Sequence, residues 1–342
     1  MTIRITTGQR DREAAFICEL TQVIPSITHN VKEGAVRQGI GDDAAVLRPS
    51  PRSEWAISTD FSLEGTHFRP DYPPDSIGYK SLARATSDLV AMGAKPRYFL
   101  LALALPTSKT GAWMTDFASG MSRATREFGS RLIGGDISRS ALVTICVTVL
   151  GDIPSGLAVL RSGAKPGDLI YVTGKPGAAQ LGLEITVRGL SHQPSLKQYL
   201  KPHLYPEIPT ALGQALARQR IPSAMMDISD GLSTDLTRLC ATSGVGAQIH
   251  VDRLPTVKVP SNPRLRGIDP LALALHGGDD YGLLFTAPPG SRRRLRGIPR
   301  DAQITHIGEI TRDRQIVMID HVNHTSGLEA KGWDPFRTRQ QR

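Results

Sequence analysis

Apolar residues recur along the chain at a helical period in some segments and in short continuous runs in others. Between residues 76 and 92, Leu82, Ala85 and Leu89 follow one another at helical spacing, and Gly93 provides a stop. Short apolar runs closed by polar, Gly or Pro residues instead favour buried strands. The predicted helices cover residues 13–24, 76–92, 112–128, 178–187, 210–218 and 233–242. The predicted strands cover residues 55–58, 98–105, 131–133, 142–150, 168–173, 224–227, 245–251, 281–286 and 303–307.

Helices and strands therefore alternate in both halves of the chain, which predicts a mixed α/β fold. A Gly- and Pro-rich passage at residues 151–156 is typical of a domain boundary. We accordingly expect an N-terminal domain over residues 1–152 and a C-terminal α/β domain over residues 153–342. The length of 342 residues is ordinary for two domains.

The charge balance is basic, with 41 Lys and Arg residues against 32 Asp and Glu residues. The excess gathers at residues 292–300 and in the last residues of the chain. Aromatic residues make up only 5%, and no helix-turn-helix, zinc-finger or RNA-binding motif accompanies the basic runs. We interpret those runs as solvated surface and expect no nucleic-acid partner.

The sequence also argues against a membrane protein. Its longest apolar run, near residues 99–105, is closed by Pro106 and is far shorter than the roughly 20 residues of a membrane span. The first residues show no apolar signal-peptide core. Three widely spaced cysteines form no metal or redox pair motif. These features predict a cytoplasmic protein without membrane attachment.

Aspartates follow short apolar or Gly-rich runs in four separate segments, and a further one, Asp88, lies on the helix predicted at residues 76–92. Ligand sites of open α/β sheets lie at strand ends, so we expect several of these carboxylates at one rim. Carboxylates grouped there would repel one another unless cations neutralised them, and Mg²⁺ binds such oxygen ligands together with substrate phosphates. Any one of them could instead form a turn, a helix cap or, for Asp88, an ion pair with Arg84. The four segments carry Asp42 and Asp43, Asp60, Asp136, and Asp227 with Asp230.

The common nucleotide-binding and catalytic loops do not occur. The sequence contains no G-x-x-x-x-G-K-[ST] loop, no protein-kinase H-R-D or D-F-G, and no G-x-S-x-G. Residues 39–44 match a degenerate dinucleotide fingerprint, but Pro49 and Pro51 follow too soon for the helix that this motif requires. A nucleotide would therefore bind through some other arrangement.

Taken together and in order, eight segments resemble the thiamine-monophosphate kinase family of the aminoimidazole-ribonucleotide-synthetase superfamily. The resemblance spans nearly the whole chain, and the set of motifs is far more specific than any one of them. The segments are GIGDDAAVL (39–47), ISTDFSLEGTHF (57–68), GYKSLARATSDLVAMGAKPRYFLLALALP (78–106), LIGGD (132–136), RSGAKPGDLIYVTGKPGAAQLGL (161–183), MMDISDGLSTDL (225–236), HGGDDYGLLFT (276–286) and KGWDPF (331–336).

The resemblance implies transfer of the ATP γ-phosphoryl group to thiamine monophosphate, with several Mg²⁺ ions bound in the cleft. It implies a homodimer in which the N-terminal sheets of two copies pair into a barrel, and it makes residues 1–152 the ATP- and Mg²⁺-binding domain. The implied Mg²⁺ ligands are Asp43, Ser58, Thr59, Asp60, Asp88, Asp136, Asp227 and Asp230. The implied ATP contacts are Gly135, Asp136, Arg161 and Ser229, and the implied thiamine contacts are His67, Asp279 and Trp333.

From the residues alone, three of these positions have structural alternatives. Arg161 could donate to phosphate or be a surface charge on a turn, and His67 could contact substrate or satisfy its own loop. Trp333 could stack on the heteroaromatic rings of a substrate or fill the core. Apart from the metal ligands, Arg161 is the one residue to which we assign a direct part in catalysis.

Two segments depart from the family pattern. Where the family has Gly-Gly-Glu-Asp-Tyr-Glu, this chain has Asp279, one methylene shorter, and Gly282, which lacks the carboxylate. Residues 135–140 read GDISRS in place of GDTTRG. Two alternatives stay open, namely another ATP-using enzyme of the superfamily and a non-catalytic protein that binds nucleotide or thiamine phosphate.

Overall fold

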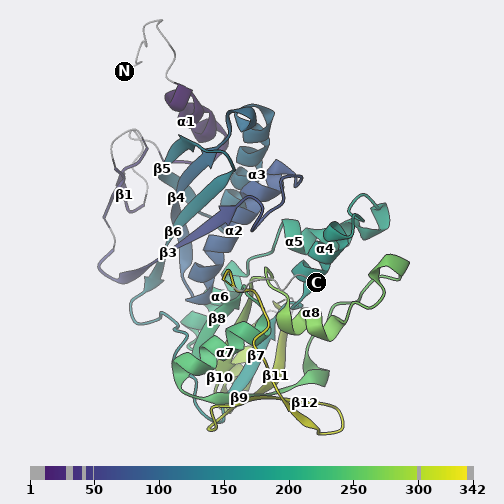
Figure 1. Ribbon diagram of the computed structural model, residues 1–342. Coiled ribbons are helices and arrows are strands. Elements are labelled where there is room, and N and C mark those ends of the chain that lie inside the picture. Colours follow the sequence, from purple (N-terminus) through teal and green to yellow (C-terminus); the bar gives the residue numbers. More distant parts are fainter. Residues whose placement is uncertain (1–11, 28–33, 41–43, 49, 299–301, 337–342) are drawn as a thin grey trace, which may run out of the picture. The chain divides into compact units, whose positions relative to one another are not determined.

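The computed structural model describes residues 12–27, 34–40, 44–48, 50–298 and 302–336 (Figure 1). The chain divides into two compact units, and each is built from separate stretches of sequence. Unit 1 comprises Met1–Pro51, Ile57–Ala85 and Pro96–Gly151, and unit 2 comprises Arg52–Ala56, Thr86–Lys95 and Asp152–Arg342. The predicted domain boundary at residue 152 stays a prediction.

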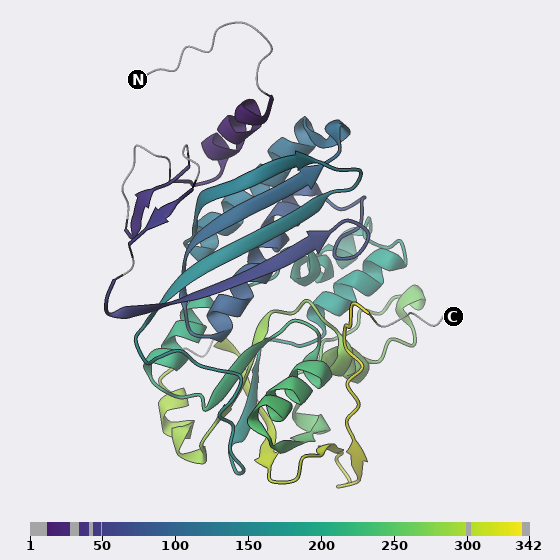
Figure 2. The same cartoon turned by 60° about the vertical axis from the view of Figure 1, so that its left-hand side comes forward.

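Unit 1 is organised around a four-stranded sheet in the order β3-β6-β4-β5. Its strands are β3 (Ser53–Leu63), β4 (Lys95–Leu105), β5 (Arg131–Arg139) and β6 (Thr144–Pro154). Figure 2 shows α2 (Pro74–Ala91) and α3 (Ala112–Phe128) behind this sheet, on the face turned away from the viewer. The helix α1 (Arg12–Val23) precedes a small antiparallel pair, β1 (Val36–Gln38) and β2 (Val46–Leu47).

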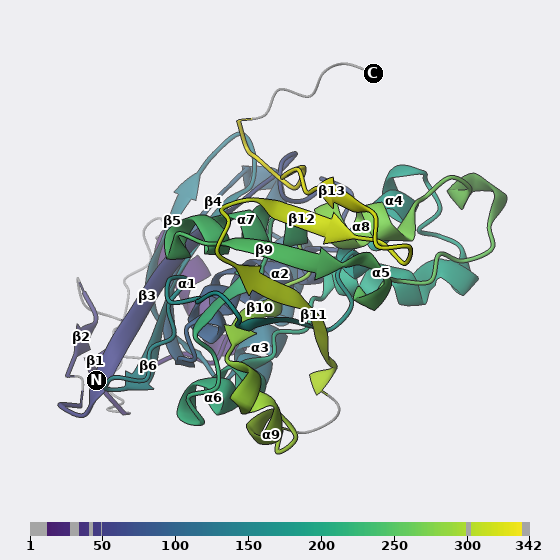
Figure 3. The same cartoon turned by 90° about the horizontal axis from the view of Figure 1, so that it is seen from below.

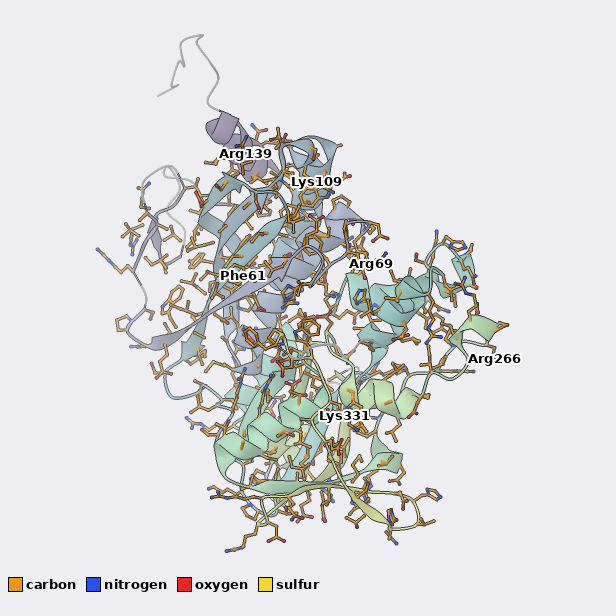
Figure 4. All side chains as sticks on the ribbon, viewed as in Figure 1. Phe61, Arg69, Lys109, Arg139, Arg266 and Lys331 are labelled. Carbon is orange, nitrogen blue, oxygen red and sulfur yellow. The ribbon has the colours of Figure 1, made fainter. Side chains whose placement is uncertain are left out.

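The edge strand β3 alternates between two environments, as a strand with one covered face should. Ala56 and Ser62 are buried, whereas Ile57 and Phe61 are 64% and 54% exposed. The exposed set lies on the opposite sheet face from the buried set. Phe61 is labelled on β3 in Figure 4.

Unit 2 contains a seven-stranded mixed sheet in the order β13-β12-β9-β11-β7-β10-β8, seen from below in Figure 3. The helices are α4 (Ala178–Val187), α5 (Lys197–Leu204), α6 (Thr210–Arg218), α7 (Leu232–Ser243), α8 (Pro270–His276) and α9 (Arg292–Leu295). The strands are β7 (Leu169–Thr173), β8 (Ala224–Ile228), β9 (Gly246–His250), β10 (Gly282–Ala287), β11 (Ile304–Thr311), β12 (Ile316–Ile319) and β13 (Thr325–Gly327).

This second sheet is buried on both faces at β7 and at its edge strand β8. Every residue of β7 and β8 is buried, including polar Asp227 and Thr173. Phe285 of β10 stacks on Tyr171 of β7 with ring centroids 5.1 Å apart. Runs of consecutive apolar residues rather than alternation are the signature of such strands.

The mixed α/β class and all six predicted helices are confirmed, with ends that differ by no more than two residues. The sequence pattern did not predict α5, α8, α9 or the short strands β1, β2, β12 and β13. In the part of the chain that the structure describes, no helix combines the length and apolar character needed to cross a membrane.

Among the predicted strands that end too early, two change where the aspartates lie. The strand predicted at 55–58 continues as β3 to Leu63, because its polar residues occupy alternate positions of an edge strand and do not end it. The strand predicted at 131–133 continues as β5 through Gly135. An added Cβ at Gly135 would lie 2.0 Å from the Leu101 carbonyl oxygen, so this glycine marks close approach of β4 and not a strand end. Asp60 and Asp136 therefore lie within strands, and the prediction that they follow strand ends was wrong. Asp227 lies one residue before the end of β8, close to the predicted end.

Candidate active site

A buried carboxylate lies in β8 of unit 2. The Asp227 side chain is buried, and its Oδ2 accepts a 2.9 Å hydrogen bond from Ser87 Oγ. Burial raises the pKa of Asp227 well above its usual range, and the negative charge of Asp88 raises it further, whereas Arg161 opposes the shift. Asp88, Asp227 and Arg161 therefore interact electrostatically. A divalent cation bound between the two carboxylates would offset the cost of keeping both charges in this environment.

The loop after β8 is held by two residues that the sequence analysis did not single out. The backbone N–H groups of Ser229 and Asp230 both donate to Oδ2 of buried Asp235, at 3.1 Å each. Arg238 Nη1 donates to Asp235 Oδ1 at 3.1 Å and also pairs with Asp230 Oδ2. Burial and the Asp230 charge raise the pKa of Asp235 to about 7. The sequence did contain a signal for this arrangement. Asp235 and Arg238 are an acid and a base three residues apart in the first turns of α7, shortly after the Asp-Gly of the loop.

The segment between α8 and β10 joins the same loop. The Asp279 N–H donates to the Ser229 carbonyl oxygen at 2.8 Å, and the Asp279 carboxylate accepts from Tyr281 Oη at 2.6 Å. Asp279 and Tyr281 both have positive φ, at 68° and 53°, which is strained for residues with side chains. The strain is maintained by backbone bonds to Ser229 and Ile228.

Asp280 anchors this segment to the start of α4. Its two carboxylate oxygens accept hydrogen bonds from the N–H groups of Gly177 and Ala179. Burial raises the pKa of Asp280 to about 7, although these bonds act in the opposite direction. Gly282, which departs from the glutamate of the family pattern, fits the local geometry. An added Cβ at this position would lie 2.7 Å from the Thr173 carbonyl oxygen.

Trp333 lies at the same loop of unit 2. Its N–H donates to the Asp230 carbonyl oxygen at 2.8 Å, while the residue is 40% exposed. The alternative that this tryptophan fills the core is therefore wrong. The structure thus joins four of the predicted positions, Ser229, Asp230, Asp279 and Trp333, through backbone hydrogen bonds.

The predicted site residues of unit 1 are distributed over both faces and both edges of its sheet. Asp60 Oδ1 lies 3.7 Å from Arg84 Nη2, and Ser58 occupies the same face of β3. The Thr59 side chain is on the opposite face, where Oγ1 lies 3.0 Å from Thr148 Oγ1. Gly135 and Asp136 are exposed on β5, the other edge strand, three strand spacings or about 14 Å across the sheet from β3.

The two remaining predicted positions of unit 1 are His67 and Asp43. His67 Nδ1 accepts a 3.0 Å hydrogen bond from the Leu63 N–H, so its ring already serves the loop that contains it. Asp43 lies outside the described residues.

The donor chemistry of unit 2 fits a hard divalent cation. Within the described residues, no group of three or more His, Cys, Asp or Glu side chains is arranged to hold a metal ion. Mg²⁺ does not require one, because it usually binds through one or two carboxylates and completes its shell with water and substrate phosphates. Asp88 and Asp227 supply such a pair of carboxylates.

Comparison with known protein families gives the general class of this protein. Residues 41–153 match the N-terminal domain, and residues 165–321 the C-terminal domain, of AIR synthase related proteins. A thiamine-monophosphate kinase of Salmonella typhimurium is 38% identical over 89% of this chain and 93% of its own length. The chain therefore belongs to the thiamine-monophosphate kinase family.

Solved structures agree with this membership. A thiamine-monophosphate kinase from Stenotrophomonas maltophilia K279a matches with a TM-score of 0.77 and 31% identity, covering 89% of this chain and 95% of that one. AaThiL complexed with AMPPCP and TMP matches with a TM-score of 0.74 and 28% identity, covering 97% of this chain and all of that one. The predicted family and two-domain fold are confirmed.

Proposed function

We propose that this chain transfers the γ-phosphoryl group of ATP to thiamine monophosphate and releases thiamine diphosphate and ADP. The observation that carries the proposal is its similarity, over 97% of its length, to a protein solved with AMPPCP and TMP. Identity of 38% to a thiamine-monophosphate kinase supports the same acceptor.

The reaction suits a site without a strong general base. The attacking group is a phosphate oxygen that is already ionised at neutral pH, so the protein must mainly align two phosphorylated substrates and neutralise their charge. In unit 2, Asp88, Asp227 and Asp230 are the proposed ligands of Mg²⁺. When bound there, Mg²⁺ supplies positive charge to the phosphate oxygens that attack and leave.

The remaining proposed roles follow the resemblance. Exposed Arg161 would donate to a phosphate, and Ser229 and Gly135 would contact ATP. Trp333, a residue that is 40% exposed, would stack on the thiamine rings, and Asp279 and His67 would contact the same substrate. Asp60 and Asp136, with Ser58, Thr59 and Asp43, are proposed as further Mg²⁺ ligands.

We also propose that two copies pair through the exposed face of the unit 1 sheet. Ile57 and Phe61 are 64% and 54% exposed on that face of β3, on either side of Thr59. Apolar groups gathered on one sheet face favour an interface over solvent. A second copy presenting the same face would bury both sets at once.

The decisive assay measures thiamine diphosphate formed from thiamine monophosphate and ATP, with and without Mg²⁺. We expect Mg²⁺-dependent product and ADP in equal amounts. ADP formed without thiamine diphosphate would indicate another acceptor and thus another enzyme of the superfamily. Mg–ATP binding with no ADP under any condition would indicate the non-catalytic alternative.

A further inference from the structure

Three consecutive backbone N–H groups attach residues 331–333 to the start of α7. The Lys331 N–H donates to Ser233 Oγ at 3.4 Å, the Gly332 N–H to Thr234 Oγ1 at 3.1 Å, and the Trp333 N–H to the Asp230 carbonyl oxygen at 2.8 Å. Figure 4 labels Lys331, the first residue of this segment, beside α7 and α8. No regular secondary structure imposes this path, so the side-chain hydroxyls of α7 and one carbonyl oxygen define it.

The fit between the two segments leaves no room for a side chain at the middle residue. Gly332 is buried, and an added Cβ would lie 2.0 Å from the Asp230 carbonyl oxygen and 2.6 Å from Thr234 Oγ1. Contacts this short with a backbone oxygen do not occur, so any larger residue must move one segment away from the other. Glycine at position 332 is thus required by close approach.

The Ser233 hydroxyl also contacts a histidine, His276. Ser233 is buried, and its Oγ lies 2.9 Å from Nδ1 of His276, the last residue of α8. A neutral His276 with its proton on Nε2 accepts from the Ser233 hydroxyl, which leaves the Ser233 oxygen as an acceptor for the Lys331 N–H. Burial and the nearby Lys331 charge lower the pKa of His276, which keeps the ring neutral around pH 7.

We infer that residues 331–333 form a strap that sets the position of the Trp333 ring against the Asp230 loop, with Gly332, Ser233 and His276 as positioning residues. The inference rests on the proposed function, in which Trp333 meets the thiamine rings and Asp230 a metal ion. The Asp230 backbone is held by Asp235 on one side and by the strap on the other. The strap thereby connects the acceptor side of the reaction to the metal side, and a preorganised ring loses less freedom when substrate binds.

The first test compares Gly332→Ala with Gly327→Ala, because a Cβ at Gly327 would meet nothing within 4 Å. We expect Gly332→Ala to raise the KM for thiamine monophosphate by about tenfold or more, approaching the effect of Trp333→Ala. The KM for ATP should change by less than about threefold, since ATP does not use the ring. Gly327→Ala should match the unsubstituted chain in both constants. Equal KM values for thiamine monophosphate in both glycine variants would overturn the strap.

A second test needs no catalysis and uses the full-length chain. Hydrogen–deuterium exchange should show the amides of residues 331–333 protected, and Ser233→Ala should speed exchange at Lys331 by about tenfold while leaving β8 protected. Rapid exchange at all three amides in the unsubstituted chain would overturn the strap even if Gly332→Ala failed to fold. An unsubstituted chain that makes no thiamine diphosphate but shows this protection would contradict the proposed function and leave the strap intact.

Discussion

The two sheets of this protein use their faces differently. In unit 1, β3 alternates between buried residues such as Ala56 and exposed apolar ones such as Phe61. In unit 2, β7 and β8 are buried along their whole length. The sheet of unit 1 leaves apolar side chains exposed on one face, where we propose that a second copy binds. The sheet of unit 2, buried on both faces at β7 and β8, can offer chemistry only through isolated buried groups such as Asp227 and through the loops at its strand ends.

The largest effects, on kcat, are expected for two aspartates, one from each sheet. Asp227→Asn and Asp60→Asn should each lower kcat by about 1,000-fold or more, because an amide cannot replace a charged metal ligand. Their stabilities should differ. Without metal, Asp227→Asn removes the cost of holding a proton on a buried carboxyl whose pKa is raised to about 8, and it should raise the free energy of unfolding near pH 7 by about 1–2 kcal/mol. Asp60→Asn loses a partly exposed ion pair with Arg84, at 3.7 Å, and should lower the free energy of unfolding by less than about 1 kcal/mol.

Both quantities are directly measurable for this pair. Initial rates at saturating Mg²⁺ give kcat, and thermal unfolding in a chelator gives stability. Near-normal rates in either variant would contradict the proposed role of that carboxylate.

Aromatic truncation compares a buried position of one sheet with an exposed position of the other. Phe285 is fully buried in β10 against Tyr171, so Phe285→Ala should lower the free energy of unfolding by about 3–5 kcal/mol. Phe61→Ala on the exposed face of β3 should cost less than about 1 kcal/mol in dilute protein. Urea unfolding followed by circular dichroism measures both. Similar losses would mean that the β3 face is covered within a single chain.

A charged residue on the exposed face tests the partner directly. Phe61→Asp should weaken dimerisation by about 100-fold, because an unpaired carboxylate would be buried between two copies. Val187→Asp is a matched control in unit 2, since Val187 is 62% exposed. Sedimentation over a range of concentrations measures both dissociation constants. A dimer unaffected by Phe61→Asp would place the interface elsewhere.

The last comparison concerns the pH dependence of stability. Burial raises the pKa of Asp280 to about 7, so between about pH 4 and pH 7 the folded chain holds a proton that the unfolded chain has lost. Stability contributed by this group therefore falls as pH rises through that window. Asp280→Asn should reduce the slope by up to about 1.4 kcal/mol per pH unit.

An exposed acid in unit 1 is the control for this experiment. The hydrogen bond from Arg69 lowers the pKa of Asp71, so its stabilising effect is lost only as pH falls through that lowered pKa. Asp71→Asn should leave the slope between pH 4 and pH 7 unchanged. Chemical denaturation of the metal-free protein at several pH values checks both variants, and an unchanged slope in Asp280→Asn would contradict the burial argument.

Local pattern was sufficient for the regular elements. The helical spacing of Leu82, Ala85 and Leu89 predicted α2, and continuous apolar runs predicted β7 and β8, because these periodicities reflect which faces are buried. Local pattern failed where a polar or glycine residue inside a strand looked like the end of the strand. Polar Thr59 and close-packed Gly135 resembled strand ends, but pairing with neighbouring strands continues through both.

For the candidate site too, the sequence indicated residues but not the contacts that hold them. The recurrence of aspartates such as Asp227 and Asp230 suggested chemistry, and eight motifs in order indicated the family and, with it, Trp333. The partners that hold these residues lie far away in the sequence. Ser87 is 140 positions from Asp227, and Lys331 is 98 positions from Ser233, so no local pattern could connect them.

The sequence by itself determined the α/β class, the six principal helices and the family, because local periodicity and residue identity are written along the chain. Only the tertiary structure decided that Asp227 is buried beside the charge of Asp88, that Trp333 is tied to the Asp230 carbonyl, and that one face of β3 is left exposed. Burial and electrostatic interaction depend on distances through space between residues remote in sequence, and those distances exist only once the chain has folded.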